Sequence, residues 1–175
     1  MLSVFCAPSR YVQGRNATRQ LPSELVRLGI GGRCLIVASP SAYGLLEGLW
    51  QETFEQAGIA LDVVLFQGEC SRNEIERLAA EARHLGAETL IGAGGGKVLD
   101  TARAVAAMLG KPVACCPTTA ASDAPCSALS VVYTPEGTFE ECLFYARNPE
   151  LVLVDTTVIA LSLIHISEPT RRRGI

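Results

Sequence analysis

The sequence predicts an α/β protein built on a doubly wound parallel sheet with an added β-hairpin. Short apolar runs such as "CLIVAS", "VVLF" and "LVLV" alternate with stretches of helical spacing over most of the chain. Unbroken apolar runs of this length are typical of strands that are buried on both faces of a parallel sheet. A polar loop and two strands joined by a turn then interrupt the alternation, which predicts the hairpin.

Apolar patterning and helix-capping residues set the expected elements. Asn16 is placed as the N-cap of a helix, and Ser71 followed by Glu74 has the spacing of a capping box. A glycine closes each of the later helical patterns. The predicted strands are residues 3–6, 33–39, 60–66, 88–93 and 111–116, and the predicted helices are residues 16–28, 41–57, 72–85 and 97–109.

The pattern changes after Cys116. Residues 117–127, "PTTAASDAPCS", read as a polar loop of small residues. The stretch 128–145 predicts two strands around a turn that contains Pro and Gly. A last strand is expected at 149–156, followed by the start of a helix.

Composition and charge exclude several classes of protein. Apolar residues make up 49% of the chain and charged residues 19%, which is enough to fill a core and too apolar for a disordered chain. No apolar run approaches the roughly 20 residues of a spanning helix, and a net charge of −3 does not favour nucleic acid or an anionic membrane. The N-terminus lacks the features of a signal peptide. The seven cysteines are odd in number and contain no C-x-x-C pair, so we expect reduced thiols in a cytoplasmic protein.

A glycine loop, Gly94–Gly96, stands between a predicted strand and a predicted helix in "IGAGGGKVLDTARAVA". The free N–H groups and partial positive charge of a helix N-terminus attract anions, and glycine lets a phosphate approach the backbone closely. Val98 follows Lys97 where a Walker A loop needs Ser or Thr, and no register of the glycines gives G-x-G-x-x-G. The loop therefore favours a bound pyrophosphate, with a ligand-free strand-to-helix turn as the alternative.

Two charged residues follow the glycines. Lys97 is placed either to meet a phosphate or to point into solvent. Asp100 stands one turn into the helix. It can interact with the helix dipole there, or orient the loop or a ligand through a hydrogen bond.

The polar loop offers a second group of candidate side chains. Pro117 ends a predicted strand, and ligands of open α/β sheets bind beyond the carboxyl ends of the strands. The loop contains the hydroxyls of Thr118, Thr119, Ser122 and Ser127 and the carboxylate of Asp123. An ordinary surface loop has a similar composition, so both interpretations stay open.

Together these stretches resemble the glycerol dehydrogenases of the iron-containing alcohol dehydrogenase superfamily. The resemblance rests on "GGGKVLDTARA", "PTTAASDAPCSALSVVYTPEGTFE" and "NPELVLVDT", with weaker support from "GECSRNEIERL". It covers residues 1 to about 160 and implies a Rossmann-like domain that binds NAD. A glycerol-1-phosphate dehydrogenase-like enzyme and a non-catalytic nucleotide-binding module remain as alternatives.

The resemblance implies a role for each matching position. Gly95, Gly96 and Lys97 would line the pyrophosphate, and Thr118 would contact the adenosine side of the cofactor. Ser127, Leu129 and Tyr133 would contact the nicotinamide half, and Asp123 would face the glycerol hydroxyls. Further residues are expected to bind the cofactor without a more specific role: Gly94, Asp100 and Thr119. Ser39 stands where family members often carry an acidic residue for the adenine ribose. The preference for NAD over NADP is therefore open.

The resemblance also implies a second half. Related enzymes carry a helical domain that holds a divalent metal, usually zinc, through an aspartate and two histidines. We expect that domain to be missing here, residues 1–160 to be the NAD-binding domain, and the chain alone to be inactive. Residues 161–175 contain "LSLIHISEPTR", which resembles a translated sequencing adapter and is expected to be non-native. The whole enzyme is expected to act on a polyol as a homo-oligomer.

Overall fold

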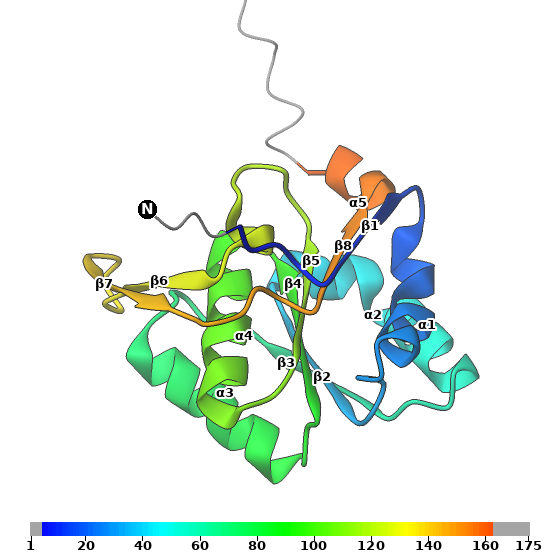
Figure 1. The fold of residues 1–175 in the computed structure, drawn as a ribbon, viewed down its shortest axis with the longest axis horizontal. Coiled ribbons are helices and arrows are strands. Elements are labelled where there is room, and N and C mark those ends of the chain that lie inside the picture. Colours follow the sequence, from blue (N-terminus) through cyan, green and yellow to red (C-terminus); the bar gives the residue numbers. More distant parts are fainter. Residues whose placement is uncertain (1–4, 163–175) are drawn as a thin grey trace, which may run out of the picture.

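The computed structural model describes residues 5–162, and six parallel strands form its central sheet (Figure 1). The strand order is β1-β8-β5-β4-β2-β3. Their bounds are β1 Arg10–Gly14, β2 Cys34–Ala38, β3 Leu61–Leu65, β4 Thr89–Gly94, β5 Val113–Pro117 and β8 Leu151–Asp155. Strands β6, Leu129–Tyr133, and β7, Phe139–Phe144, form a separate antiparallel hairpin. The predicted doubly wound sheet with an added hairpin is confirmed.

Helices cover both faces of the sheet (Figure 1). On one face lie the 3-10 helix η1, Ala17–Gln20, and helices α1, Leu21–Arg27, and α2, Pro40–Gln56, around a core that contains Trp50 and Phe54. On the other face lie α3, Arg72–His84, and α4, Gly96–Leu109, around a core that contains Leu78 and Val105. The 3-10 helix η2, Ala124–Cys126, and helix α5, Thr156–Ala160, complete the described elements. None of the helices within residues 5–162 is long and apolar enough to cross a membrane.

Local sequence signals explain most helix ends. Ser71 Oγ accepts a hydrogen bond from the Glu74 N–H at 3.3 Å and caps α3. The expected capping box is only half formed, because the Glu74 carboxylate instead accepts the Gln67 N–H at 2.8 Å and pairs with Arg77. Gly110 ends α4 in the left-handed region, with φ 64°, where glycine is favoured.

The first strand and first helix differ from the prediction. Of the strand expected at 3–6, residues 3 and 4 lie outside the described residues, and Phe5 and Cys6 are not in a strand. The observed edge strand is β1, in which exposed and half-buried residues alternate, so it has no apolar run to mark it. The expected helix at 16–28 is divided into η1 and α1, with a proline at the start of α1.

Asn16 also differs from its expected role. It precedes η1 in a left-handed conformation, with φ 55°, and its side chain makes no capping bond. The Asp155 carboxylate, at the end of β8, accepts the N–H groups of Asn16 and Thr18 at 3.0 and 2.9 Å instead. The cap of η1 is therefore supplied from a distant part of the sequence.

The parallel register brings the carboxyl ends of the strands to one edge of the sheet. Ala38 pairs with Ala93, and Gly94 pairs with Pro117. The strand order changes direction between β2 and β4, because β3 lies beyond β2 and β5 lies beyond β4. Helix α2 leaves this point on one face and α4 on the other. It is a topological switch point, where ligands of open α/β sheets bind.

Candidate functional site

The glycine loop lies at the switch point, at the carboxyl end of β4. A Cβ on Gly94 would lie 2.8 Å from Val98 Cγ2 and 3.2 Å from Ser39 Cβ. A Cβ on Gly92 would lie 3.0 Å from Ala102 Cβ. The Gly94 contact is closer than a Cβ tolerates, and the Gly92 contact would force its neighbours to move. These two glycines therefore allow β4, α4 and the start of α2 to pack together.

The next two glycines face open space. A Cβ on Gly95 would meet no heavy atom within 4 Å, and one on Gly96 would meet only Ala124 and Ser122, at 3.7 and 3.8 Å. Gly95 is the N-cap of α4 and supplies no side chain to cap it. Among the described residues, none accepts a hydrogen bond from the backbone N–H of Gly95, Gly96 or Lys97. This is a free helix N-terminus with room for an anion.

A pocket of about 380 Å³ opens beside this loop. It is enclosed by the start of α4, the polar loop after β5 and strand β6. The predicted site residues that line it are Gly96, Lys97, Asp100, Asp123, Ser127, Leu129 and Tyr133. The fold thus brings together residues from the start of α4 to the end of β6, Gly96 to Tyr133, around one pocket.

A second pocket, of about 370 Å³, lies at the N-terminus of α2 and is lined by Thr118 and Thr119. Ser39 caps α2, because its Oγ accepts the Ala42 N–H at 3.2 Å, and it lies 3.2 Å from Ser41 Oγ. Ser41 and Ala42 line this pocket as well. The predicted adenosine-side residues and the predicted nicotinamide-side residues therefore fall into two separate pockets, and Gly94–Gly96 adjoin both groups.

Lys97 is neither unpaired in solvent nor unpaired above the glycine loop. Its Nζ forms an ion pair with Glu69, which stands in the loop between β3 and α3. The lysine side chain is more than half exposed, so this ion pair is readily exchanged for another anion. Sequence reasoning did not single out Glu69, although it lies in the "GECSRNEIERL" stretch.

Asp100 lines the pocket and also forms hydrogen bonds inside the protein. Its Oδ1 accepts Arg103 Nη1 at 2.8 Å, and its Oδ2 accepts the Val131 N–H at 3.1 Å. Burial raises the pKa of Asp100, although the Val131 N–H and the Arg103 guanidinium act in the opposite direction. Asp100 therefore ties α4 to β6. Arg103 was missed from the sequence, but its i,i+3 spacing from Asp100 could have indicated the pair.

Asp123 is the exposed carboxylate of the polar loop. It precedes η2 and lines the 380 Å³ pocket and also a neighbouring cavity of about 290 Å³. Ser127 is turned toward its own backbone, since its Oγ donates to the Ala124 carbonyl at 3.2 Å. Asp123 is thus open to a ligand from two sides of the loop.

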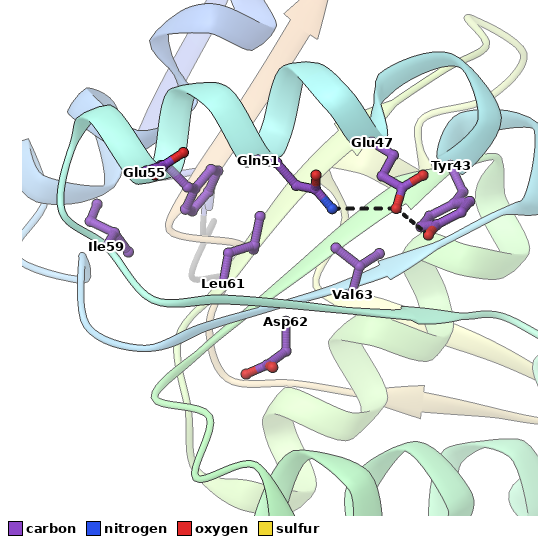
Figure 2. A pocket seen from close by; sticks show the side chains of 9 residues that line it. Tyr43, Glu47, Gln51, Glu55, Ile59, Leu61, Asp62 and Val63 are labelled. Atoms are coloured by element: carbon purple, nitrogen blue, oxygen red, sulfur yellow. Dashed lines mark hydrogen bonds between the residues drawn. The ribbon is translucent and has the colours of Figure 1, made fainter.

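A further cavity, of about 510 Å³, lies away from the predicted residues (Figure 2). It is a groove between α2 and β3, the outermost strand on that side of the sheet. Figure 2 shows Tyr43 and Gln51 directed at Glu47, whose Oε1 accepts Gln51 Nε2 at 3.3 Å. The groove contains none of the predicted site residues and has no strand end at the switch point, so we place the candidate site elsewhere.

The described residues contain no disulfide and no cluster of possible metal ligands. All seven cysteines are free thiols, as expected. Burial raises the pKa of Cys34 to about 12 and of Cys70 and Cys115 to about 11, so these thiols stay protonated. Within residues 5–162 no group of three His, Cys, Asp or Glu side chains could hold a metal ion.

An open parallel sheet with a free helix N-terminus between two pockets at its switch point is typical of nucleotide-binding α/β proteins. Residues 8–156 match the family described as iron-containing alcohol dehydrogenase, so the chain belongs to that family. This confirms the superfamily named by the resemblance.

The relatives are longer than this chain. It is 45% identical to a glycerol dehydrogenase of Pseudomonas putida over 88% of this chain and 42% of the relative. It is also 45% identical to a glycolaldehyde reductase of Halobacterium salinarum over 91% of this chain and 43% of the relative. The crystal structure of a probable glycerol dehydrogenase from Sinorhizobium meliloti superposes with a TM-score of 0.83 at 34% identity, over 91% of this chain and 42% of that structure. The chain thus spans less than half the length of these relatives.

Proposed function

We propose that this chain is the dinucleotide-binding part of an NAD-dependent glycerol dehydrogenase, which oxidises glycerol to dihydroxyacetone. The observation that carries the proposal is the row of free N–H groups from Gly95 to Lys97 between two pockets at the switch point. NAD consists of two nucleosides joined by a diphosphate, and this arrangement matches it in chemistry and in order. The printed names of the relatives in Pseudomonas putida and Sinorhizobium meliloti support the substrate.

The residues present fit the cofactor. The N–H groups of Gly95, Gly96 and Lys97 would hold the diphosphate, with the Lys97 ammonium exchanging Glu69 for a phosphate oxygen. Ser39, Thr118 and Thr119 would lie at the adenosine, and Ser127, Leu129 and Tyr133 at the nicotinamide. NAD supplies the hydride acceptor when bound. Asp123 would accept hydrogen bonds from polyol hydroxyls, as an exposed carboxylate beside that pocket can.

The rest of the enzyme would lie outside this chain. We expect a divalent metal, with zinc as the first candidate, to be held by a part of the enzyme that corresponds to the remaining length of the relatives, of which this chain covers 42% and 43%. The chain alone should then bind cofactor without turnover. Homo-oligomer formation, a cytoplasmic location and the domain boundary at residue 160 stay predictions, and residues 163–175 lie outside the described residues.

A phosphorylated polyol is disfavoured as the substrate. Lys97 is the one cationic side chain among the described residues that line the 380 Å³ pocket, and it is paired with Glu69. A substrate phosphate in addition to the cofactor diphosphate would need further cations. The glycolaldehyde reductase of Halobacterium salinarum is as similar as the glycerol dehydrogenase of Pseudomonas putida, so glycolaldehyde belongs in any substrate panel.

Equilibrium dialysis of the chain with NAD, ADP-ribose and inorganic pyrophosphate tests the cofactor. We expect NAD and ADP-ribose to bind and to compete with each other, and pyrophosphate to bind more weakly because it reaches neither nucleoside pocket. Equal binding of all three would indicate a plain phosphate-binding module. Turnover of glycerol by the chain alone would contradict the expected division of the enzyme.

A further inference from the structure

The guanidinium of Arg103 is buried at the junction of α4, the polar loop and the hairpin. Its side chain is only 2% exposed, and it lies on α4 about two turns after the glycine loop. A cation is costly to bury unless its N–H groups find partners. The hydrogen-bond partners of Arg103 therefore indicate which segments of the chain it holds together.

Arg103 binds Asp100 on its own helix and two other segments, the polar loop and β6. Nη1 donates to Asp100 Oδ1 at 2.8 Å and to the Leu129 carbonyl, and Nη2 donates to the Ala124 carbonyl. Asp100 continues the connection, since its Oδ2 accepts the Val131 N–H at 3.1 Å. Its backbone carbonyl accepts Ser130 Oγ at 2.7 Å. One ion pair thus fixes both the polar loop and β6 to the helix that begins at the glycine loop.

The two carbonyls bound by Arg103 bracket the nicotinamide side of the pocket. Ala124 directly follows Asp123, and Leu129 lies two residues after Ser127. All of these residues line the same 380 Å³ pocket. The guanidinium is a rigid planar fork whose two Nη groups bind two carbonyls and a carboxylate, and an ammonium cannot reproduce that geometry.

We infer that Arg103 is a positioning residue for the nicotinamide half of the cofactor pocket. It sets the distance from the diphosphate-binding N–H groups of α4 to Ser127, Leu129 and Tyr133, without itself touching the cofactor. The inference rests on the proposed dinucleotide function. It predicts a selective effect: ligands with a nicotinamide depend on Arg103, and ligands without one do not.

The test compares NADH with ADP-ribose on the 175-residue chain. We expect the unmodified chain to bind NADH more tightly than ADP-ribose and to enhance the fluorescence of the bound reduced nicotinamide. Arg103→Met should weaken NADH at least tenfold and abolish the enhancement, while the ADP-ribose dissociation constant changes less than twofold. Arg103→Lys keeps the charge beside Asp100 and should recover part of the NADH affinity.

A matched control and a second variant distinguish a selective loss of NADH affinity from a general loss of folding. Arg83→Met makes the same chemical change on an exposed position of α3 and should leave both ligands unaffected. If Arg103→Met does not fold because Asp100 is left buried and unpaired, the double variant Asp100→Asn, Arg103→Met removes both charges. That variant should fold and still lose the preference for NADH.

The possible results separate the two proposals. An unchanged ratio of NADH to ADP-ribose affinity in a folded Arg103 variant overturns the inference, and so does an equal loss of both ligands. If the unmodified chain binds neither ligand, the dinucleotide function itself fails and the inference fails with it. A selective loss of NADH supports both.

Discussion

Two parts of the carboxyl edge of the sheet are held in place by different means. At the central edge, formed by the ends of β2 and β4, the backbone sets the geometry, because Gly92 and Gly94 leave no room for a side chain. At the outer edge, formed by the ends of β5, β8 and β1, polar side chains set it. Arg103, on α4, and Asn148, before β8, bind carbonyls of the polar loop that follows β5. Asp155, at the end of β8, binds N–H groups at the start of η1. The geometry of the central edge therefore depends on residue type alone, whereas the geometry of the outer edge depends on hydrogen bonds between segments that are distant in the sequence.

The largest loss of stability is expected from Asp155→Asn at the outer edge. The buried carboxylate accepts three backbone N–H groups, from Asn16, Thr18 and Thr157, at 3.0, 2.9 and 2.9 Å. Since an amide oxygen replaces only part of these charge-assisted bonds, the free energy of unfolding should fall by roughly 2–3 kcal/mol at neutral pH. Urea unfolding measures it. Asp62→Asn, which breaks a more exposed pair with Arg33, should cost less than about 1 kcal/mol.

A second prediction for Asp155→Asn concerns how its loss of stability depends on pH. Burial alone would raise the pKa of Asp155, but the N–H donors of Thr18 and Thr157 outweigh it and lower the pKa below the usual 3.8. The carboxylate therefore stabilises the folded state above the unfolded pKa, and this contribution is lost as the pH falls through the lower folded pKa. The difference between Asp155→Asn and the unmodified chain should shrink on acidification below about pH 4. A difference that grows on acidification would contradict this sign.

A smaller loss is expected from Gly92→Ala at the central edge. The new Cβ would lie 3.0 Å from Ala102 Cβ and 3.3 Å from Leu99 Cα, so α4 must move away from β4. We expect the free energy of unfolding to fall by about 2 kcal/mol. Gly48→Ala, in α2 with open space around its Cβ, should instead raise it by about 0.5–1 kcal/mol. Identical unfolding curves for the two variants would refute a backbone-held central edge.

Ser39→Asp, at the central edge, tests whether the site prefers NAD or NADP. A carboxylate here would accept the ribose 2′-hydroxyl of NAD and repel the 2′-phosphate of NADP. The ratio of the dissociation constants for 2′-phospho-ADP-ribose and ADP-ribose should rise at least tenfold, or about 1.4 kcal/mol. Ser23→Asp on the exposed side of α1 is the matched control. An unchanged ratio would place the adenine ribose away from Ser39.

The smallest stability effect is expected from Asn148→Ala, which removes a side chain that holds the polar loop of the outer edge. Asn148 Nδ2 donates to the Cys126 carbonyl at 2.7 Å and holds the end of the polar loop. The variant should lower the free energy of unfolding by about 1 kcal/mol, as for one part-buried hydrogen bond. Calorimetry should detect it as a lower Tm. No change would mean that Arg103 alone holds the loop.

The central edge could be predicted from the sequence, whereas the supports of the outer edge could not. Apolar runs, the glycine loop and the glycine at the end of α4 each act through local backbone preferences, so they can be read one residue at a time. Apart from the local contacts of Arg103 with Asp100 and of Asp155 with Thr157, the side-chain partners of Arg103, Glu69 and Asp155 are 12 to 139 residues away. No local sequence pattern indicates those distant pairs. Strand β1 was displaced in the prediction for a related reason, because an edge strand needs no continuous apolar run.

The measurement that bears most directly on the central claim is the affinity of Gly95→Ala for ADP-ribose. Gly95 has φ −81°, which alanine adopts freely, and its Cβ would meet no atom of the protein within 4 Å. The fold should therefore be unharmed, with the free energy of unfolding unchanged or raised by up to about 1 kcal/mol. If the N–H groups from Gly95 to Lys97 hold the diphosphate, the added methyl group occupies the ligand's space and the affinity falls at least tenfold. A folded Gly95→Ala that binds ADP-ribose as tightly as the unmodified chain would show that the diphosphate lies elsewhere.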